Sequence, residues 1–143
     1  MKKKKIIKLE GHNHDLFTII GISSHEKGYT LTWALNNSME MSFSRREDLE
    51  EIRPGNEETL HFPVFFFNDE TRKISYFLIQ NRSPEGFLVT EWPTFDFLLI
   101  IPELIESNLQ KNLLSQLKKV PGIQAAFLMN PADISNPARL LIE

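Results

Sequence analysis

Two carboxylates are the residues of this sequence best suited to take part in catalysis or binding. Glu91 and Asp96 lie close together at the start of a strongly apolar stretch. Paired carboxylates can divide general-acid and general-base roles when their environments separate their pKa values. Because Pro93 interrupts the chain between them, their spacing does not decide whether the two groups converge. Two interpretations stay open: a structural role for both groups, which we favour, and a shared binding or active-site pocket.

Asp96 makes the more specific prediction, because apolar residues flank it on both sides. Burying a carboxylate without a partner is costly. We therefore expect an arginine or a backbone N–H beside Asp96, or a position for it at the open end of a strand.

Histidines offer the next candidate chemistry. His12 and His14 would share one face of a strand and could bind a metal there, with His25 and His61 joining from elsewhere. No second ligand pair has a diagnostic spacing, so we predict no metal site and no cofactor. The chain contains no cysteine, which excludes disulfides, thiolate zinc sites and a cysteine nucleophile.

Signatures of common enzymes and of nucleic-acid binding are also missing. The sequence has no Gly-x-Ser-x-Gly elbow, no glycine-rich phosphate loop and no dinucleotide fingerprint. The run Phe65-Phe66-Phe67 beside Arg72 and Lys73 could stack on bases. However, consecutive strand residues alternate faces, so a core role explains the run equally well. With a net charge of −3, we predict no nucleic-acid partner, and the sequence favours a non-enzyme without deciding the matter.

The length of 143 residues predicts one domain over residues 1–143. Residues 1–5 read as a flexible, lysine-rich lead-in, and residues 130–143 as a tail that either docks or stays flexible. Only Ile6 and Ile7 follow the lysines before Lys8, so there is no signal-peptide core. No apolar run is long enough to span a membrane. We expect a cytoplasmic protein without a membrane partner.

Apolar periodicity and turn residues predict the elements. The N-terminal part gives a strand pair at 3–10 and 16–22, a helix at 23–37 with a Ser23–Glu26 capping box, and a strand at 39–43. A charged connection at 45–55 then leads to further strands at 60–67, 73–80 and 87–91. The pair 60–67 and 73–80 forms a hairpin, and Pro63 predicts an edge position or a bulge.

The C-terminal part reads as strand, helix, strand. A strand at 95–101 is apolar on both faces, and a helix at 107–119 opens with a Ser107–Gln110 capping box. Leu109, Leu113 and Leu117 recur at spacing four and predict the buried side of this helix. A strand at 123–129 follows. A crossover this short favours parallel pairing of the two strands. The whole pattern predicts an α+β fold: a mostly antiparallel sheet with two helices packed on it.

The helix predicted at 23–37 has two apolar faces. Leu31, Ala34 and Leu35 lie on one side, and Tyr29 and Trp33 lie on nearly the opposite side. The helix is therefore either wedged between the sheet and another segment, or it presents Tyr29 and Trp33 to a partner or a second copy. Such aromatic residues are enriched in interface cores.

Residues 89–97 (VTEWPTFDF) resemble the motif that names the bacterial IPExxxVDY proteins. Glu91 and Asp96 fall on the Glu and Asp of that motif. Conservative matches to its Ile, Val and Tyr are Val89, Phe95 and Phe97. Thr90 departs from the motif's Pro, and a proline stands instead at position 93.

Other stretches resemble the same family in the same order: residues 21–24, 29–36, 81–83 and 120–127. The resemblance implies a small intracellular protein and supplies no catalytic residues. Any role of the motif's tyrosine hydroxyl would be absent here, because Phe97 replaces that tyrosine.

These observations favour a non-enzymatic protein-interaction or scaffolding module, with a homodimer as one form it could take. The candidate interface is Tyr29 and Trp33. The alternative is a small-molecule-binding protein or enzyme that uses Glu91 and Asp96 in one pocket. The partner, the ligand, the oligomeric state and the strand order stay open.

Overall fold

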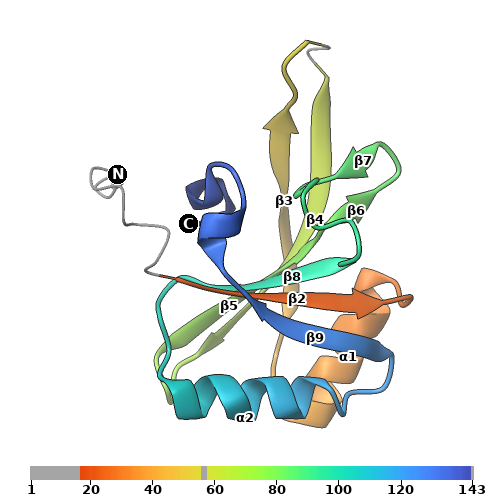
Figure 1. Ribbon diagram of the computed structural model, residues 1–143. Coiled ribbons are helices and arrows are strands. Elements are labelled where there is room, and N and C mark those ends of the chain that lie inside the picture. Colours follow the sequence, from red (N-terminus) through yellow and green to blue (C-terminus); the bar gives the residue numbers. More distant parts are fainter. Residues whose placement is uncertain (1–16, 56–57, 143) are drawn as a thin grey trace.

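The computed structural model describes residues 17–55 and 58–142, which form a six-stranded antiparallel sheet and two α-helices (Figure 1). The strands follow the order β3-β4-β5-β8-β2-β9 across the sheet. In chain order they are β2 (Thr18–Ser24), β3 (Ser44–Ile52), β4 (Thr59–Asp69), β5 (Ile74–Gln80), β8 (Phe97–Ile101) and β9 (Ile123–Met129). The helices are α1 (Gly28–Met39) and α2 (Ser107–Leu117). The predicted α+β class is confirmed.

Four short elements complete the described chain. A two-stranded ribbon consists of β6 (Arg82–Ser83) and β7 (Gly86–Phe87). Two 3-10 helices, η3 (Pro131–Asp133) and η4 (Pro137–Leu140), follow β9. The predicted strand at 87–91 is therefore wrong beyond Phe87, because the chain leaves the ribbon there and crosses the sheet as an irregular loop.

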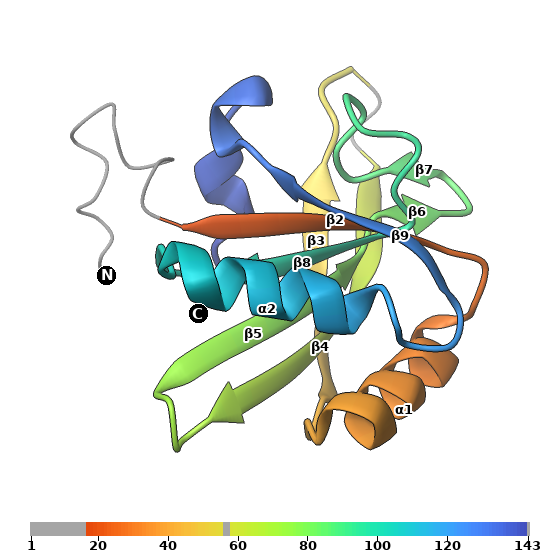
Figure 2. The same cartoon turned by 60° about the horizontal axis from the view of Figure 1, so that its bottom comes forward.

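Both helices pack on one face of the sheet, as Figures 1 and 2 show. From α2, Leu113 and Leu117 point into this layer, as the spacing of its leucines predicted, and Leu31 and Leu35 enter from α1. The sheet contributes alternate residues of its central strands, including Ile20, Ile22, Leu78, Leu99 and Ile101. We call this side the helix face.

The opposite face of the sheet is covered by irregular chain in the described residues. Its core includes Leu88, Val89, Trp92 and Phe95 from the loop after β7, with Ile134 and Leu140 from the C-terminal segment. Sheet residues of the other parity, such as Ile19, Ile79 and Ile100, lie beneath them. We call this side the loop face. The tail therefore docks on the body through residues 131–142.

The predicted direct pairing of the last two long strands is wrong. β2 lies between β8 and β9 and pairs antiparallel with each of them. β8 and β9 therefore run parallel to each other, but no hydrogen bonds join them because β2 lies between them. β2 takes this central place because its apolar run is buried on both faces of the sheet. Residues 3–10, the predicted hairpin partner of β2, lie outside the described residues.

The charged segment after α1 is also a strand, contrary to the predicted connection. β3 pairs with β4 at the edge of the sheet, where its alternating charged side chains reach water. Of residues 39–43, predicted as a strand, Met39 is the last residue of α1 and the rest form an irregular connection that turns at Glu40, which has a φ of 55°. A register shift sets Glu47 and Asp48 opposite Pro63, so the predicted bulge at this proline is confirmed.

Both predicted capping boxes are wrong. β2 continues through Ser24, and α1 begins at Gly28 after Lys27, without a side-chain cap. α2 begins at Ser107 after Glu106, likewise uncapped by a side chain. Gly28 is required by packing, because a Cβ there would lie 2.8 Å from the ring of Phe65.

Candidate functional site

The segment that carries Glu91 and Asp96 is held on the loop face by Asn81. This asparagine is fully buried just after β5. Its Nδ2 donates to the carbonyl oxygens of Trp92 at 3.1 Å and Phe95 at 2.8 Å, and its Oδ1 accepts from the N–H of Val89 at 2.8 Å. One side chain therefore satisfies three backbone groups that no strand partner reaches.

The backbone of Asn81 extends the same role. Its N–H donates to the carbonyl of Asp96 at 2.8 Å, and its carbonyl accepts from the N–H of Leu88 at 2.8 Å. Sequence analysis missed this residue as a site, because an asparagine before Arg82-Ser83-Pro84 reads as an ordinary turn residue. Nothing in the local pattern separates a buried asparagine from an exposed one.

Asp96 links this loop to the end of β2 and to Arg82 of β6. Its Oδ2 accepts from the N–H of Ser24 at 2.8 Å. Its Oδ1 faces the guanidinium of Arg82, with distances of 2.9 Å to Nε and 2.8 Å to Nη2. The predicted partners, an arginine and a backbone N–H, are both present. Such two-point pairing fixes the orientation of the carboxylate.

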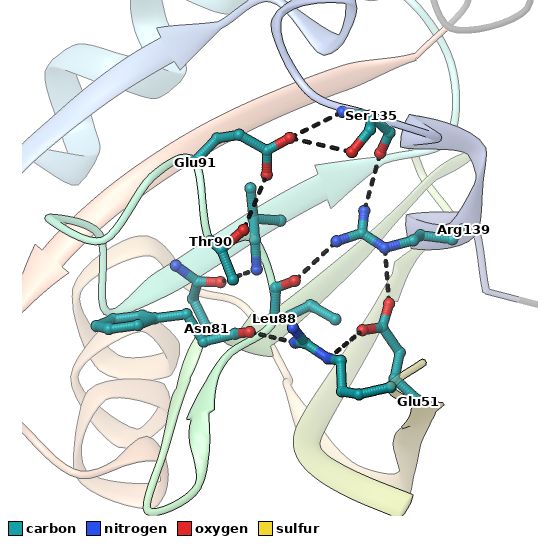
Figure 3. A network of polar contacts seen from close by, with 10 residues as sticks. Glu51, Asn81, Leu88, Thr90, Glu91, Ser135 and Arg139 are labelled. Carbon is teal, nitrogen blue, oxygen red and sulfur yellow. Dashed lines mark hydrogen bonds and ion pairs between the residues drawn. The ribbon is translucent and has the colours of Figure 1, made fainter. Parts of the chain in front are cut away.

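Glu91 links the loop to the C-terminal segment instead (Figure 3). Its Oε2 accepts from the N–H of Ser135 at 3.0 Å and from the hydroxyl of Ser135 at 3.1 Å. The backbone N–H of Ser135 is the main cause that lowers the pKa of Glu91 below its ordinary value. Hydrogen bonds to the ionised form favour that form.

An arginine and a glutamate strengthen the same attachment (Figure 3). Arg139 donates to the carbonyl of Leu88 at 2.7 Å and to that of Ser135 at 3.2 Å, and its Nε lies 2.6 Å from Glu51. On the other oxygen of Glu51 lies the Nε of Arg53 at 3.4 Å. The network thus joins β3, the loop and the tail, and sequence reasoning missed it because its members are far apart in the chain.

The two carboxylates are therefore committed to different parts of the molecule. Asp96 lines a cavity of about 570 Å³ at the N-terminal end of α1, and Glu91 is not among the residues that line it. The cavity wall combines aromatic Tyr29 and Phe65 with the cationic side chains of Arg45 and Arg82. Arg82 faces this cavity while bound to Asp96.

Tyr29 and Trp33 lie on the outer side of α1, and 67% and 68% of their surfaces are exposed. The inner side of the helix is occupied by Leu31, Ala34 and Leu35. The wedge interpretation is therefore wrong for the residues that the structure describes, because none of them covers the two aromatic rings. Tyr29 also lines the cavity beside Asp96, so the aromatic surface and the cavity adjoin.

The histidine candidates do not assemble in the described chain. His12 and His14 lie outside the described residues. His25 lines the cavity at α1. His61 lies on β4, where its Nδ1 is 3.7 Å from Oε2 of Glu50 on β3. Within residues 17–55 and 58–142, no group of histidine and acidic side chains is placed to hold a metal.

In the same residues, no helix has the length and apolar character to cross a membrane.

Comparison with protein-family models, with curated proteins and with solved structures gives no match. The contacts described above are the basis for inferring a function. They show two carboxylates engaged in structural hydrogen bonds and an aromatic helix surface that is about two-thirds exposed.

Proposed function

We propose that the protein is a non-enzymatic interaction module whose partner-binding surface is the outer side of α1. The observation that carries the proposal is the exposure of Tyr29 and Trp33 one helical turn apart. Aromatic residues of this type dominate the binding energy of many interfaces. Their exposure in the free chain leaves that energy available to a partner.

The fold gains little from these two rings. Leu31 and Leu35, on the inner side of α1, are fully buried and supply its packing against the sheet. Removing an exposed ring should change the free energy of unfolding by about 0.5 kcal/mol or less. Binding and folding can therefore be separated by substitution at positions 29 and 33.

The cavity next to Tyr29 adds a concave site to the exposed aromatic surface. A partner that packs on the two rings can place a side chain between Phe65 and the Arg82–Asp96 pair. Interface hot spots are enriched in tryptophan, tyrosine and arginine and lie in pockets that become desolvated on binding. We propose a protein partner on these grounds, and no nucleic acid.

A matched set of variants tests this proposal. Tagged wild type, the double variant Tyr29→Ala/Trp33→Ala and Ile52→Ala are compared by quantitative affinity capture in the native host. Ile52 is 70% exposed on β3 and serves as the control for loss of an apolar surface residue. Partners retained by wild type and Ile52→Ala but lost by the double variant are expected. Identical capture by all three folded proteins would contradict the proposal.

A second candidate function is binding of a small molecule in the cavity beside Asp96. The supporting observation is its volume of about 570 Å³ together with the Arg82–Asp96 pair on its wall, since ligand sites commonly measure roughly 300–1,000 Å³. Native mass spectrometry of protein purified from its host would find added small-molecule mass that Arg82→Ala removes. A bare mass in wild type counts against this candidate.

We also propose membership of the IPExxxVDY family and a cytoplasmic location. In support, the motif residues Glu91 and Asp96 each fasten one end of the same loop. A crystal structure of an established member tests membership: its motif is expected in the loop before the fourth strand of the same sheet order. A different fold would exclude membership, and fractionation of host cells tests the location.

A further inference from the structure

The two edges of the sheet differ in how they meet water. β3, at one edge, has the sequence SRREDLEEI and a bulge opposite Pro63. Charges and bulges of this kind protect an edge strand from pairing with another chain. β9, at the other edge, has the sequence IQAAFLM, with neither a charged residue nor a proline.

β9 is regular where its edge is open. Its register with β2 shifts near its start, between the pairs Ser24–Ile123 and Ser23–Ala125. Residues 125–129 then pair with β2 without interruption. In a strand, half of the backbone N–H and C=O groups point to each side. Within residues 17–55 and 58–142, no strand pairs with the outer side of this segment, which therefore presents a row of donors and acceptors there.

Exposed apolar side chains accompany the open edge. Phe127 and Leu128 are 53% and 44% exposed, and they point to opposite faces of the sheet. Phe127 lies on the loop face, with its ring centroid 6.1 Å from that of Phe95. Leu128 lines a cavity of about 310 Å³ together with Leu104, which is also exposed.

We propose that β9 pairs antiparallel with β9 of a second copy of this chain, so that the two sheets join across a two-fold axis. The absence of charge in the strand favours this occupant, because no like charges would face each other along the seam. Identical surfaces related by a two-fold axis must be self-complementary. An uncharged strand meets that condition for the whole of residues 125–129.

The side chains also fit such an axis. Antiparallel pairing about a two-fold axis perpendicular to the sheet keeps the helix faces on one side. It also sets one residue opposite its own copy. With Phe127 at that centre, small residues meet large ones: Ala126 faces Leu128 of the second copy, and Ala125 faces Met129. Cross-strand pairs of this kind are the unit of sheet stabilisation.

Native mass spectrometry and sedimentation of the full chain test the proposal. Wild type should be a dimer in the micromolar range, and Phe127→Lys should be a monomer with an unchanged circular dichroism spectrum. Ile52→Lys, which alters a still more exposed apolar residue at the other edge, should remain a dimer. Leu128→Lys provides a second variant if Phe127→Lys does not fold.

A charge-exchange experiment sharpens the test. Phe127→Lys and Phe127→Glu should each be monomeric alone and should form a mixed dimer when combined, because position 127 faces itself across the axis. A monomeric wild type, a dimer that Phe127→Lys leaves intact, or a mixture without mixed dimers would overturn the proposal. The variant Tyr29→Ala/Trp33→Ala should remain dimeric, so this surface and the α1 surface can fail separately.

Discussion

The two faces of the sheet are covered by different means. On the helix face, two amphipathic helices bury leucines against the central strands. On the loop face, irregular segments bury apolar side chains against the sheet. Hydrogen bonds with the side chains of Asn81, Glu91 and Arg139 satisfy backbone groups of these segments. A helix satisfies its own backbone groups, whereas a loop needs outside partners.

This difference explains which polar residues are available for function. The two carboxylates both make structural hydrogen bonds, because Glu91 holds the C-terminal tail and Asp96 holds the end of β2. On the helix face, only the inner side of α1 packs against the sheet, and Tyr29 and Trp33 on its outer side stay exposed. Glu91 and Asp96 therefore serve the fold, and the exposed side of α1 carries the proposed interaction.

Substitution of Asn81 should destabilise the loop face more than any other single change proposed here. Asn81→Ala would remove three hydrogen bonds. It would leave the Phe95 carbonyl and the Val89 N–H unsatisfied, each at a cost of about 1–3 kcal/mol, whereas the Trp92 carbonyl would keep its bond from the N–H of Phe95. We expect the free energy of unfolding to fall by about 3 kcal/mol or more, as measured by urea denaturation. Asn37→Ala, at an exposed asparagine of α1, is the control and should stay within about 0.5 kcal/mol of wild type.

The packing of loop on sheet can be probed at Gly21. A Cβ at this position of β2 would lie 2.4 Å from the ring of Phe95. Gly21→Ala should cost about 1–3 kcal/mol through overpacking. Combined with Phe95→Leu, it should cost less than the two single changes together, because the smaller side chain makes room. Additive costs would indicate that the loop does not press on the sheet there.

Arg139 tests the attachment of the tail. Arg139→Ala removes the bonds to Leu88 and Ser135 and the ion pair with Glu51. We expect a loss of about 1.5 kcal/mol and faster proteolysis within residues 131–142. Arg139→Lys should recover only part of this, because an ammonium cannot reproduce the guanidinium fork. Unchanged proteolysis in Arg139→Ala would contradict a tail held from this side.

Glu91 should give the smallest effect, and a pH-dependent one. Its folded pKa is lowered mainly by the N–H of Ser135. The stabilisation is therefore complete above the ordinary glutamate pKa and is lost as pH falls through the lower folded value. The stability difference between wild type and Glu91→Gln should shrink on acidification across that window. A difference that grows in acid would have the wrong sign.

The helix face was largely predictable from the sequence. Helical spacing identified the buried leucines of α2, and turn residues identified the hairpin of β4 and β5. Alternation identified β8 as buried on both faces, although Phe95 and Asp96 lie outside the strand. These features depend on local periodicity, which a single sequence displays.

The loop face was not predictable in the same way. Its key contacts join residues such as Glu51 and Arg139, or Asn81 and Phe95, whose pairing has no local pattern. β3 was missed because charged residues are typical of connections, although an edge strand tolerates them. The place of β9 beside β2 likewise depended on long-range burial.

The outer side of α1 should contact a partner, whereas Glu91 and Asp96 should serve only the fold. Site-specific photo-crosslinking in host cells tests this most directly, with the probe at position 33 and, as a control, at position 52. Crosslinks to a defined partner protein from position 33, preserved in Glu91→Gln and absent from position 52, are the predicted result. No crosslink from position 33, or equal crosslinking from both positions, would contradict the account.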